Sequence, residues 1–184
     1  MEDMEVNLER EAAIAEAVLF LESEPLSVGA LAQAAQLSPE VVEECIVLLK
    51  EKYARADSGL ELAVIAGGYV LTPRRDIWDS LKERYGKKSG GRLSKAALET
   101  LSIIAYSQPI TRAEIEALRG ASPDTMIRLL LERKLIKEDG RKDVPGKPAQ
   151  FVTTKEFLVF FHLDSIADLP KLDQEEIDRF ELAR

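Results

Sequence analysis

The sequence has little of the chemistry that metal proteins and disulfide-rich proteins need. Cys45 is the only cysteine and His162 the only histidine among the 184 residues. One cysteine excludes a disulfide framework within the chain, and one cysteine with one histidine cannot make a Cys/His metal site. We therefore expect no bound metal, a reducing cytoplasmic setting, and Cys45 as part of a hydrophobic core.

Long hydrophobic runs are also missing. No stretch reaches the roughly 18 apolar residues that a membrane span requires. The apolar run at 12–21 is interrupted by Glu16, and the N-terminal residues are acidic where a secretory signal would be basic. We expect a protein that is neither exported nor inserted in a membrane.

Motifs of catalysis are absent as well. The sequence has no glycine-rich loop with P-loop spacing, no G-x-S-x-G motif, and only His162 as a possible base for a nucleophile. Paired carboxylates such as Glu43 and Glu44 are predicted to lie on an open helix face, where nothing would shift their pKa for acid–base catalysis. We expect no enzyme activity, no cofactor and no small-molecule substrate.

Charge is plentiful but unevenly distributed. The formal net charge is -8, from 25 Lys and Arg against 33 Asp and Glu. The first sixty residues and the last thirty are acidic, whereas the middle of the chain is basic. This balance argues against a protein that coats nucleic acid. The basic middle has two interpretations, contact with phosphate or a solvated face of mixed charge.

The chain repeats itself without a gap at an offset of 84 residues. The matched positions are those that begin and end helices: Pro25 with Pro109, Leu26 with Ile110, Ser27 with Thr111, and Ser38-Pro39 with Ser122-Pro123. Such a repeat indicates two similar domains. We place them at 1–85 and 93–163, joined by a small and basic linker at 86–92 and followed by an acidic tail at 164–184.

Each copy is predicted to begin with three helices. The first helices, at about 8–22 and 94–106, carry apolar residues at helical spacing. In the second copy Thr111 and Glu114 have the spacing of a capping box, and in the first copy Ser27 is expected to be the corresponding cap. The third helices are expected to begin at Ser38 and Ser122, each an N-cap hydroxyl followed by a proline and an acidic residue.

A hairpin is predicted after the three helices of each copy. In the first copy residues 60–65 alternate as a strand does, Gly67-Gly68 is expected to turn, and 69–72 to return. In the second copy, the outgoing strand is expected at 135–137, the loop at 140–148 and the returning strand at 150–153. Three helices followed by a hairpin is the order of a winged helix. We predict a mainly α fold with small β-hairpins (α+β), built as two tandem winged-helix domains, with a helix at 74–85 closing the first.

The third helices are poorly suited to reading DNA, which calls for outward Arg, Lys, Asn or Gln. In the first copy we expect an apolar inner stripe and an acidic outer face, made of Glu40, Glu43, Glu44, Val47 and Glu51. In the second copy the offset places Met126, Leu129 and Leu130 inward. Ile127 and Leu131 then lie outward, either as a wider core stripe or as a protein-binding groove, with Arg128 and Arg133 beside them.

The loop 140–148 is the most distinctive short segment. Through Arg141, Lys142 and Lys147 it could contact phosphate or an acidic partner. Its glycines and prolines fit equally well a rigid turn with solvated charges.

Beyond this loop, Thr153 and Glu156 are predicted to form another capping box. Phe157, Phe160 and Phe161 share a helical face that we expect to pack onto the second domain. The acidic segment 173–184 is interpreted as a frayed terminus or as a helix that docks on a partner.

Several runs together resemble the segregation and condensation protein B family. They are 93–115, Arg119-Gly120, 130–133, 140–142 and 153–158, within a similarity that extends over about residues 8–170. The resemblance implies a bacterial, non-catalytic subunit of the condensin-like SMC complex. It further implies a homodimer formed largely through the first domain, which binds the central part of the kleisin subunit, segregation and condensation protein A, and through it the SMC ATPase.

The implied role is chromosome condensation and segregation during cell division, in the cytoplasm and associated with the nucleoid, with chromosomal DNA contacted only indirectly. The candidate partner-binding residues are Ile127, Leu131, Arg128, Arg141, Lys142 and Lys147, which rest on periodicity and not on the resemblance. The alternative is a dimeric winged-helix transcription regulator that reads its operator through Arg112, Arg128 and the loop 140–148.

Overall fold

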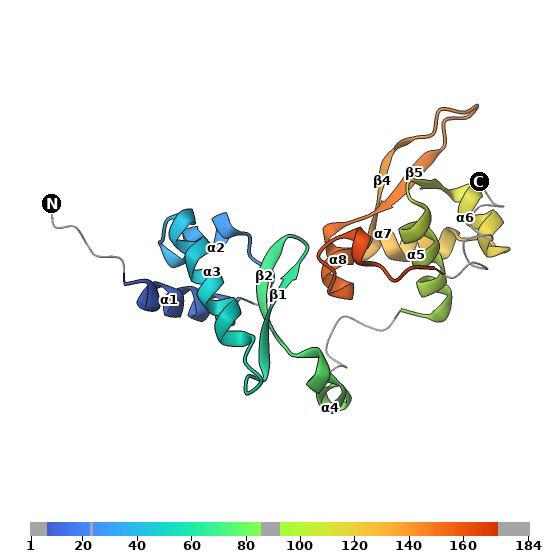
Figure 1. Ribbon diagram of the computed structural model, residues 1–184. Helices are drawn as coiled ribbons and strands as arrows, with labels where there is room; N and C mark the ends of the chain where they lie inside the picture. Colours follow the sequence, from blue (N-terminus) through green and yellow to red (C-terminus); the bar gives the residue numbers. More distant parts are fainter. Residues whose placement is uncertain (1–6, 23, 86–92, 173–184) are drawn as a thin grey trace. The chain divides into compact units, whose positions relative to one another are not determined.

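The computed structural model describes residues 7–22, 24–85 and 93–172, and the chain divides into two compact units, Met1–Ser89 and Gly90–Arg184 (Figure 1). The predicted linker at 86–92 and the acidic segment 173–184 lie outside the described residues. Among the helices of the described ranges, none combines the length and the apolar character needed to span a bilayer.

Each unit has three helices followed by a hairpin, which confirms the predicted fold class of helices with small antiparallel sheets. The elements of unit 1 are α1 (Leu8–Leu21), α2 (Val28–Ala35), α3 (Pro39–Tyr53), β1 (Leu60–Ile65), β2 (Gly68–Pro73) and α4 (Arg75–Tyr85). Those of unit 2 are α5 (Lys95–Ser107), β3 (Ile110–Thr111), α6 (Arg112–Arg119), α7 (Asp124–Glu132), β4 (Ile136–Arg141), β5 (Ala149–Thr153), α8 (Lys155–Phe161) and a 3-10 helix (Ile166–Asp168).

The repeat is visible in the strand pairing. In unit 1 Leu26 forms an isolated antiparallel bridge with Tyr69, and in unit 2 Ile110 pairs with Phe151. The segment between the first and second helices therefore joins the hairpin as a short third strand in both units. In unit 2 the resulting sheet has the order β3-β5-β4.

The turn of the first hairpin differs by one residue from the prediction. Ala66 and Gly67 are its two central residues, with φ of 51° and 74°, whereas Gly68 already pairs with Ile65. Two positive φ values are those of a turn that matches the twist of the strands. Gly68 has a different function, because a Cβ there would lie 2.9 Å from the backbone carbon of Pro25.

Most predicted caps are present. The hydroxyls of Ser27 and Ser38 accept hydrogen bonds from the amides of Ala30 and Val41, at 3.2 and 3.3 Å. Thr111 and Glu114 form the expected capping box at the start of α6. These bonds satisfy amides that a helix start leaves without partners, so local sequence defines where these helices begin.

Two predicted caps are wrong. Ser122 donates to the Asp124 carboxylate at 3.1 Å instead of capping an amide, and α7 begins at Asp124 without a side-chain cap. At α8 the cap is Thr154, whose hydroxyl accepts from the Phe157 amide at 3.2 Å. The amide of Thr153 instead donates to Gln108 Oε1 at 2.7 Å, which ties β5 to the end of α5.

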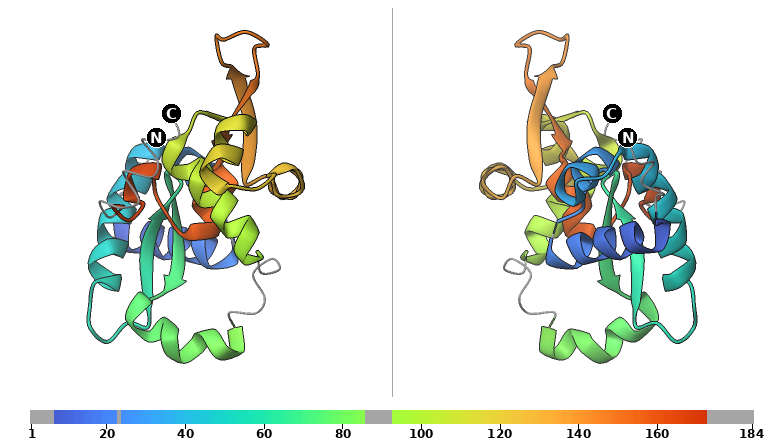
Figure 2. Two further views of the ribbon diagram at one scale, coloured as in Figure 1. Left: turned by 90° about the vertical axis from the view of Figure 1, so that its right-hand side faces the viewer. Right: turned by 90° about the vertical axis from the view of Figure 1, so that its left-hand side faces the viewer.

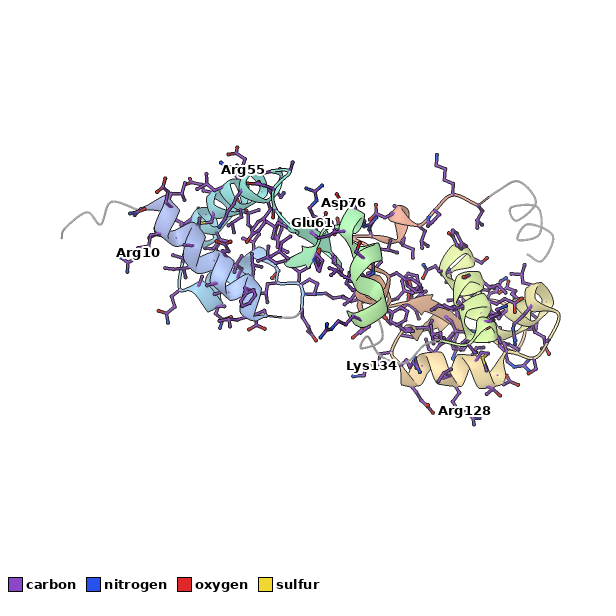
Figure 3. All side chains as sticks on the ribbon, turned by 90° about the horizontal axis from the view of Figure 1, so that it is seen from below. Arg10, Arg55, Glu61, Asp76, Arg128 and Lys134 are labelled. Carbon is purple, nitrogen blue, oxygen red and sulfur yellow. The ribbon has the colours of Figure 1, made fainter. Side chains whose placement is uncertain are left out.

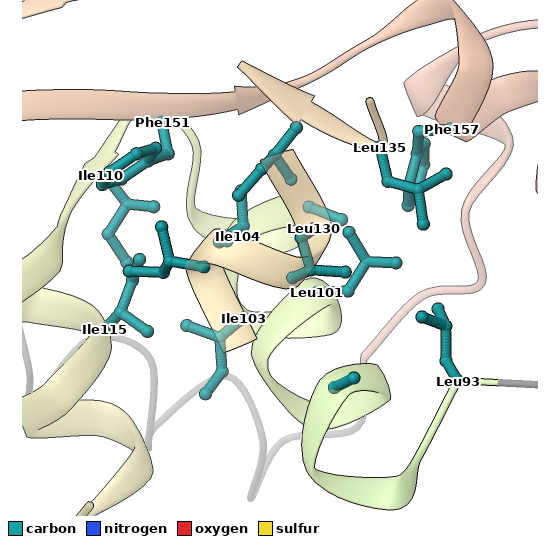
Figure 4. Close-up of a cluster of buried hydrophobic side chains, with 14 of the residues drawn as sticks. Leu93, Leu101, Ile103, Ile104, Ile110, Ile115, Leu130, Leu135, Phe151 and Phe157 are labelled. Atoms are coloured by element: carbon teal, nitrogen blue, oxygen red, sulfur yellow. The ribbon is translucent and has the colours of Figure 1, made fainter. Parts of the chain in front are cut away.

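The core of unit 2 draws from each of its α-helices and from its three strands (Figure 4). Leu101, Ile104, Ile115 and Leu130 are almost completely buried in it. Phe157 is 2% exposed and belongs to this core, as expected, but Phe160 and Phe161 are exposed at the surface. Of the three phenylalanines, only the first is therefore a core residue. Leu169 also packs here, so the unit continues past α8.

Candidate protein-binding surface

Helix α7 places the candidate residues differently from the prediction. Ile127 is 6% exposed and belongs to the core of unit 2, so the wider core stripe, one of the two alternatives, is the correct interpretation for this residue, and it is not an outward groove residue. Leu131 is half-buried and packs against the same core, and Arg128 is exposed (Figure 3). Of the two apolar candidates, only Leu131 keeps accessible surface.

The cause of this error is a shift of one residue between the two third helices. α3 begins at Pro39 and α7 at Asp124, an offset of 85 and not 84. The buried stripe of α3 includes Val42 and Cys45, and the same offset from these positions leads to Ile127 and Leu130. Because one residue turns a helix by about 100°, this shift exchanges an outer position for an inner one.

The β4–β5 hairpin projects from the helices of its unit (Figure 2). Its loop is held by its own hydrogen bonds, including Lys142 N to Pro148 O at 2.9 Å and Arg141 Nη1 to Lys147 O at 3.1 Å. Gly140 and Gly146 have positive φ of 79° and 87°. The loop is thus a structured turn that presents the exposed side chains of Arg141 and Lys147, whereas Lys142 is half-buried.

One of these basic residues is tied to the body of the unit. Lys142 Nζ donates to Glu114 Oε1, while Glu114 Oε2 accepts from the amide of Thr111 at 2.8 Å and from its hydroxyl at 2.7 Å. Burial alone would raise the pKa of Glu114, but the hydrogen bonds from Lys142 and Thr111 outweigh it and lower the pKa below its usual range. The capping box of α6 therefore also anchors the base of the hairpin.

The sequence identified Glu114 as a capping residue but gave no signal for this second contact. Lys142 lies 28 residues further along the chain, and only the folded hairpin brings it to α6. A small cavity lies beside the ion pair, lined by Pro109, Ile110, Leu118 and Gln150 together with Glu114 and Lys142.

Arg112, a key residue of the regulator alternative, is occupied by carboxylates. Its guanidinium contacts Asp124 with two nitrogens and donates from Nη1 to Glu116 Oε2 at 2.8 Å. The hydrogen bond from Arg112 lowers the pKa of Asp124 to about 2. An arginine held in this way joins α6 to the start of α7, and does not present free donors to a base edge.

The third helix of unit 1 has an acidic outer face. Glu40, Glu43, Glu44 and Glu51 are exposed on it, as predicted, and Val47 is 56% exposed among them. The opposite face of α3 buries Val42, Cys45, Ile46 and Leu49. Four carboxylates at the position where a DNA-reading helix carries donors make the regulator alternative unfavourable.

Within residues 7–22, 24–85 and 93–172, no group of three or more His, Cys, Asp or Glu is placed to hold a metal ion. Burial, with the nearby carboxylates of Glu11 and Glu44, raises the pKa of the Cys45 thiol, so this cysteine is a core residue and not a reactive thiolate.

Comparison with known proteins agrees with this picture. The family described as "Segregation and condensation complex subunit ScpB" matches residues 13–172. "Segregation and condensation protein B" of Carboxydothermus hydrogenoformans is 44% identical over 160 residues, covering 87% of this chain and 86% of the relative.

Among solved structures, ScpB from Mycobacterium tuberculosis is 30% identical, with a TM-score of 0.41. The match covers 85% of this chain and 98% of the chain in that structure. A structure described as a dimer of the ScpB N-terminal domain complexed with ScpA peptide is 27% identical, covers 41% of this chain and 95% of its own, and has a TM-score of 0.39. The family match and the sequence identity place the chain in the ScpB family of segregation and condensation complex subunits.

Proposed function

We propose that this protein is a non-catalytic subunit of an SMC–kleisin complex, which dimerises largely through unit 1 and binds the central region of the kleisin, with candidate contacts in unit 2. The proposal rests on the match of residues 13–172 to the ScpB family. The role of the protein would then be chromosome condensation and segregation, in the cytoplasm at the nucleoid, with the SMC ATPase and DNA reached only through the kleisin.

The surface of unit 2 suits a protein partner better than DNA. Leu131 supplies apolar contact area. Arg128, which follows the buried Ile127 in the sequence, lies on the exposed side of α7. Arg141 and Lys147 are presented by a loop that is already ordered by its own hydrogen bonds. An ordered loop loses little conformational entropy when it binds, which favours affinity.

Lys142 and Ile127 contribute indirectly in this proposal. Lys142 fixes the base of the hairpin through Glu114, and Ile127 fixes the rotation of α7 from inside the core. Ile127 thereby sets the positions of Leu131 and Arg128 on α7. The Lys142–Glu114 contact sets the positions of Arg141 and Lys147 on the hairpin. The partner-binding set thus separates into residues that contact the kleisin and residues that position those contacts.

The test is capture of the kleisin by the full chain. We expect Arg128→Glu combined with Arg141→Ala and Lys147→Ala to weaken capture at least about tenfold and to flatten its dependence on salt, because charged contacts are screened. Lys155→Glu, an exposed charge reversal at the start of α8, is the matched control and should bind normally. Failure of the unmodified chain to capture a kleisin and an SMC ATPase from nuclease-treated lysate would refute the proposal.

A further inference from the structure

A cavity of about 320 Å³ opens on the surface of unit 2, beside the contact between Lys142 and Glu114. Residues from the end of α5, from β3, from α6 and from the β4–β5 hairpin line it. Its apolar wall includes Ile110 and Leu118, which are buried. Ligand sites have volumes of about 300–1,000 Å³, so this cavity, at the lower end of that range, suits a single side chain of a partner.

Ser107, the last residue of α5, lines this cavity, and the packing of unit 2 gives its hydroxyl no role. The residue is 7% exposed, and within residues 7–22, 24–85 and 93–172 its hydroxyl takes part in no hydrogen bond. A buried hydroxyl without a partner costs free energy, and alanine has the higher helix propensity. Because most buried polar side chains have a partner, a polar group that enters the cavity from another molecule would explain this serine.

Two further side chains of the cavity have hydrogen-bonding capacity left. The ammonium group of Lys142 has three protons, and in the described part of the chain it donates to Glu114 alone. Gln150 donates from Nε2 to the carbonyl oxygen of Pro109 at 3.3 Å, which leaves its Oε1 as an acceptor. The cavity therefore offers donors from Lys142 and Ser107 and an acceptor from Gln150, so a matching ligand both accepts and donates hydrogen bonds.

The charges around the cavity nearly cancel, which favours an uncharged ligand. Glu114 and Lys142 neutralise each other, and both arginines of α6 are paired with carboxylates. A ligand carboxylate would face Glu114 and a ligand ammonium would face Lys142, and like charges in a partly buried site repel. The remaining charged side chains of the hairpin are three basic and three acidic ones: Lys137, Glu138, Asp139, Arg141, Asp143 and Lys147.

We propose that this cavity binds the side-chain amide of one glutamine or asparagine of the kleisin. The amide oxygen accepts hydrogen bonds from Ser107 and Lys142, its NH2 group donates to Gln150 Oε1, and its methylene groups pack against the apolar wall. The inference rests on the proposed function and adds the chemistry of one contact. It also gives Lys142 a direct contact with the partner, besides its positioning of the hairpin.

The first test measures the affinity of the full chain for the kleisin after Ser107→Ala. We expect the dissociation constant to rise about fivefold or more, because the bound amide loses a partner in a buried site. The melting temperature should not fall, because the hydroxyl has no partner to lose among the described residues. Ser102→Ala, which changes an exposed serine of the same helix, is the matched control and should bind normally. An unchanged affinity of Ser107→Ala, or an equal loss in Ser102→Ala, would refute the inference.

The second test identifies the amide by a double-mutant cycle. Each glutamine and asparagine in the central region of the kleisin is replaced by alanine in turn, and binding to the unmodified chain and to Ser107→Ala is compared. One kleisin variant should bind the unmodified chain about tenfold more weakly but lose less affinity for Ser107→Ala, because the two groups contact each other. If every kleisin substitution has the same effect on both chains, no amide contacts Ser107 and the inference is overturned.

A third test does not require the kleisin. The probe is N-acetylglutamine N-methylamide, and the readout is the methyl NMR signals of Ile110 and Leu118 in the full chain. These signals should shift with added probe, and shift more than with N-acetylglutamate N-methylamide, which has the same shape but a charged side chain. Equal shifts with both probes, or none, would contradict the selection of an amide.

The outcomes separate the cavity from the proposed function. If the unmodified chain captures the kleisin and Ser107→Ala captures it equally well, the cavity is refuted as a kleisin site while the proposed function stands. If the glutamine probe shifts the methyl signals but the unmodified chain captures no kleisin, the proposed function and the kleisin as occupant fail together, while the selection of an amide stands.

Discussion

Replacing Ile127 with alanine tests whether this residue of α7 belongs to the core or to the partner surface. Ile127 is 6% exposed, and the substitution removes three buried side-chain carbons. At about 0.8 kcal/mol per buried methylene, the lost transfer free energy is about 2.4 kcal/mol. The cavity adds to this, so we expect unit 2 to lose about 3 kcal/mol of unfolding free energy, within the usual range of about 2–5 kcal/mol.

Urea denaturation of the full chain measures this loss with an internal control. Trp78 is the only tryptophan and lies in α4 of unit 1, so its fluorescence reports unit 1, whereas far-ultraviolet circular dichroism reports both units. With an m-value of about 1–3 kcal/mol per molar urea, the midpoint of unit 2 should fall by at least about 1 M. The fluorescence midpoint should not change.

Two further variants make the test decisive. Arg128→Ala, one position along the same helix but exposed, should change stability by no more than about 0.5 kcal/mol. Ile127→Val, which keeps unit 2 folded if the alanine variant does not, should cost about 0.5–1.5 kcal/mol. The reasoning is refuted if Ile127→Ala costs less than about 1 kcal/mol while abolishing kleisin capture, since the side chain would then face the partner.

Three other predictions concern local contacts. Ser38→Ala should cost about 1 kcal/mol in thermal denaturation because it removes a helix cap, whereas Ser122→Ala should stay within about 0.5 kcal/mol. Gly68→Ala should destabilise unit 1 by about 1–3 kcal/mol, because its new methyl group meets backbone, but Gly29→Ala, with open space around it, should not. Glu114→Gln should cost about 1–2 kcal/mol at neutral pH. Folding lowers the pKa of Glu114, so the stability that its carboxylate contributes is present above the unfolded pKa near 4.5 and is lost as the pH falls through the folded pKa. The difference in unfolding free energy between the variant and the unmodified chain should therefore vanish in acid.

The success of the sequence-based prediction depended on how local the signal was. Caps at Ser27, Ser38 and Thr111 were predicted correctly, because a cap involves one side chain and an amide three residues away. The cap of α8 was placed one residue early, at Thr153. Neighbouring threonines are equivalent by local propensity, and the pairing of Thr153 with Gln108, 45 residues away, decided between them.

The rotation of α7 shows the same limit more sharply. The repeat predicted the existence of this helix and its neighbours, but transferring positions at a constant offset of 84 put Ile127 outside. At its actual start, the Asp124 carboxylate accepts hydrogen bonds from Ser122 and from Arg112. Arg112 belongs to the preceding helix, so this contact is one that the local sequence of α7 does not reveal.

By itself, the amino-acid sequence determined the duplicated order of three helices and a hairpin, the acidic outer face of α3 and the resemblance to the ScpB family. The order of the elements and the acidic face follow from periodicity, caps and composition, which act over a few residues, whereas the resemblance rests on runs of matching residues. Only the tertiary structure decided that Ile127 is buried, that Lys142 reaches Glu114 and that Phe20 and Leu21 stay exposed. Each of these depends on which face of one element meets another, and the packing of distant segments settles that choice.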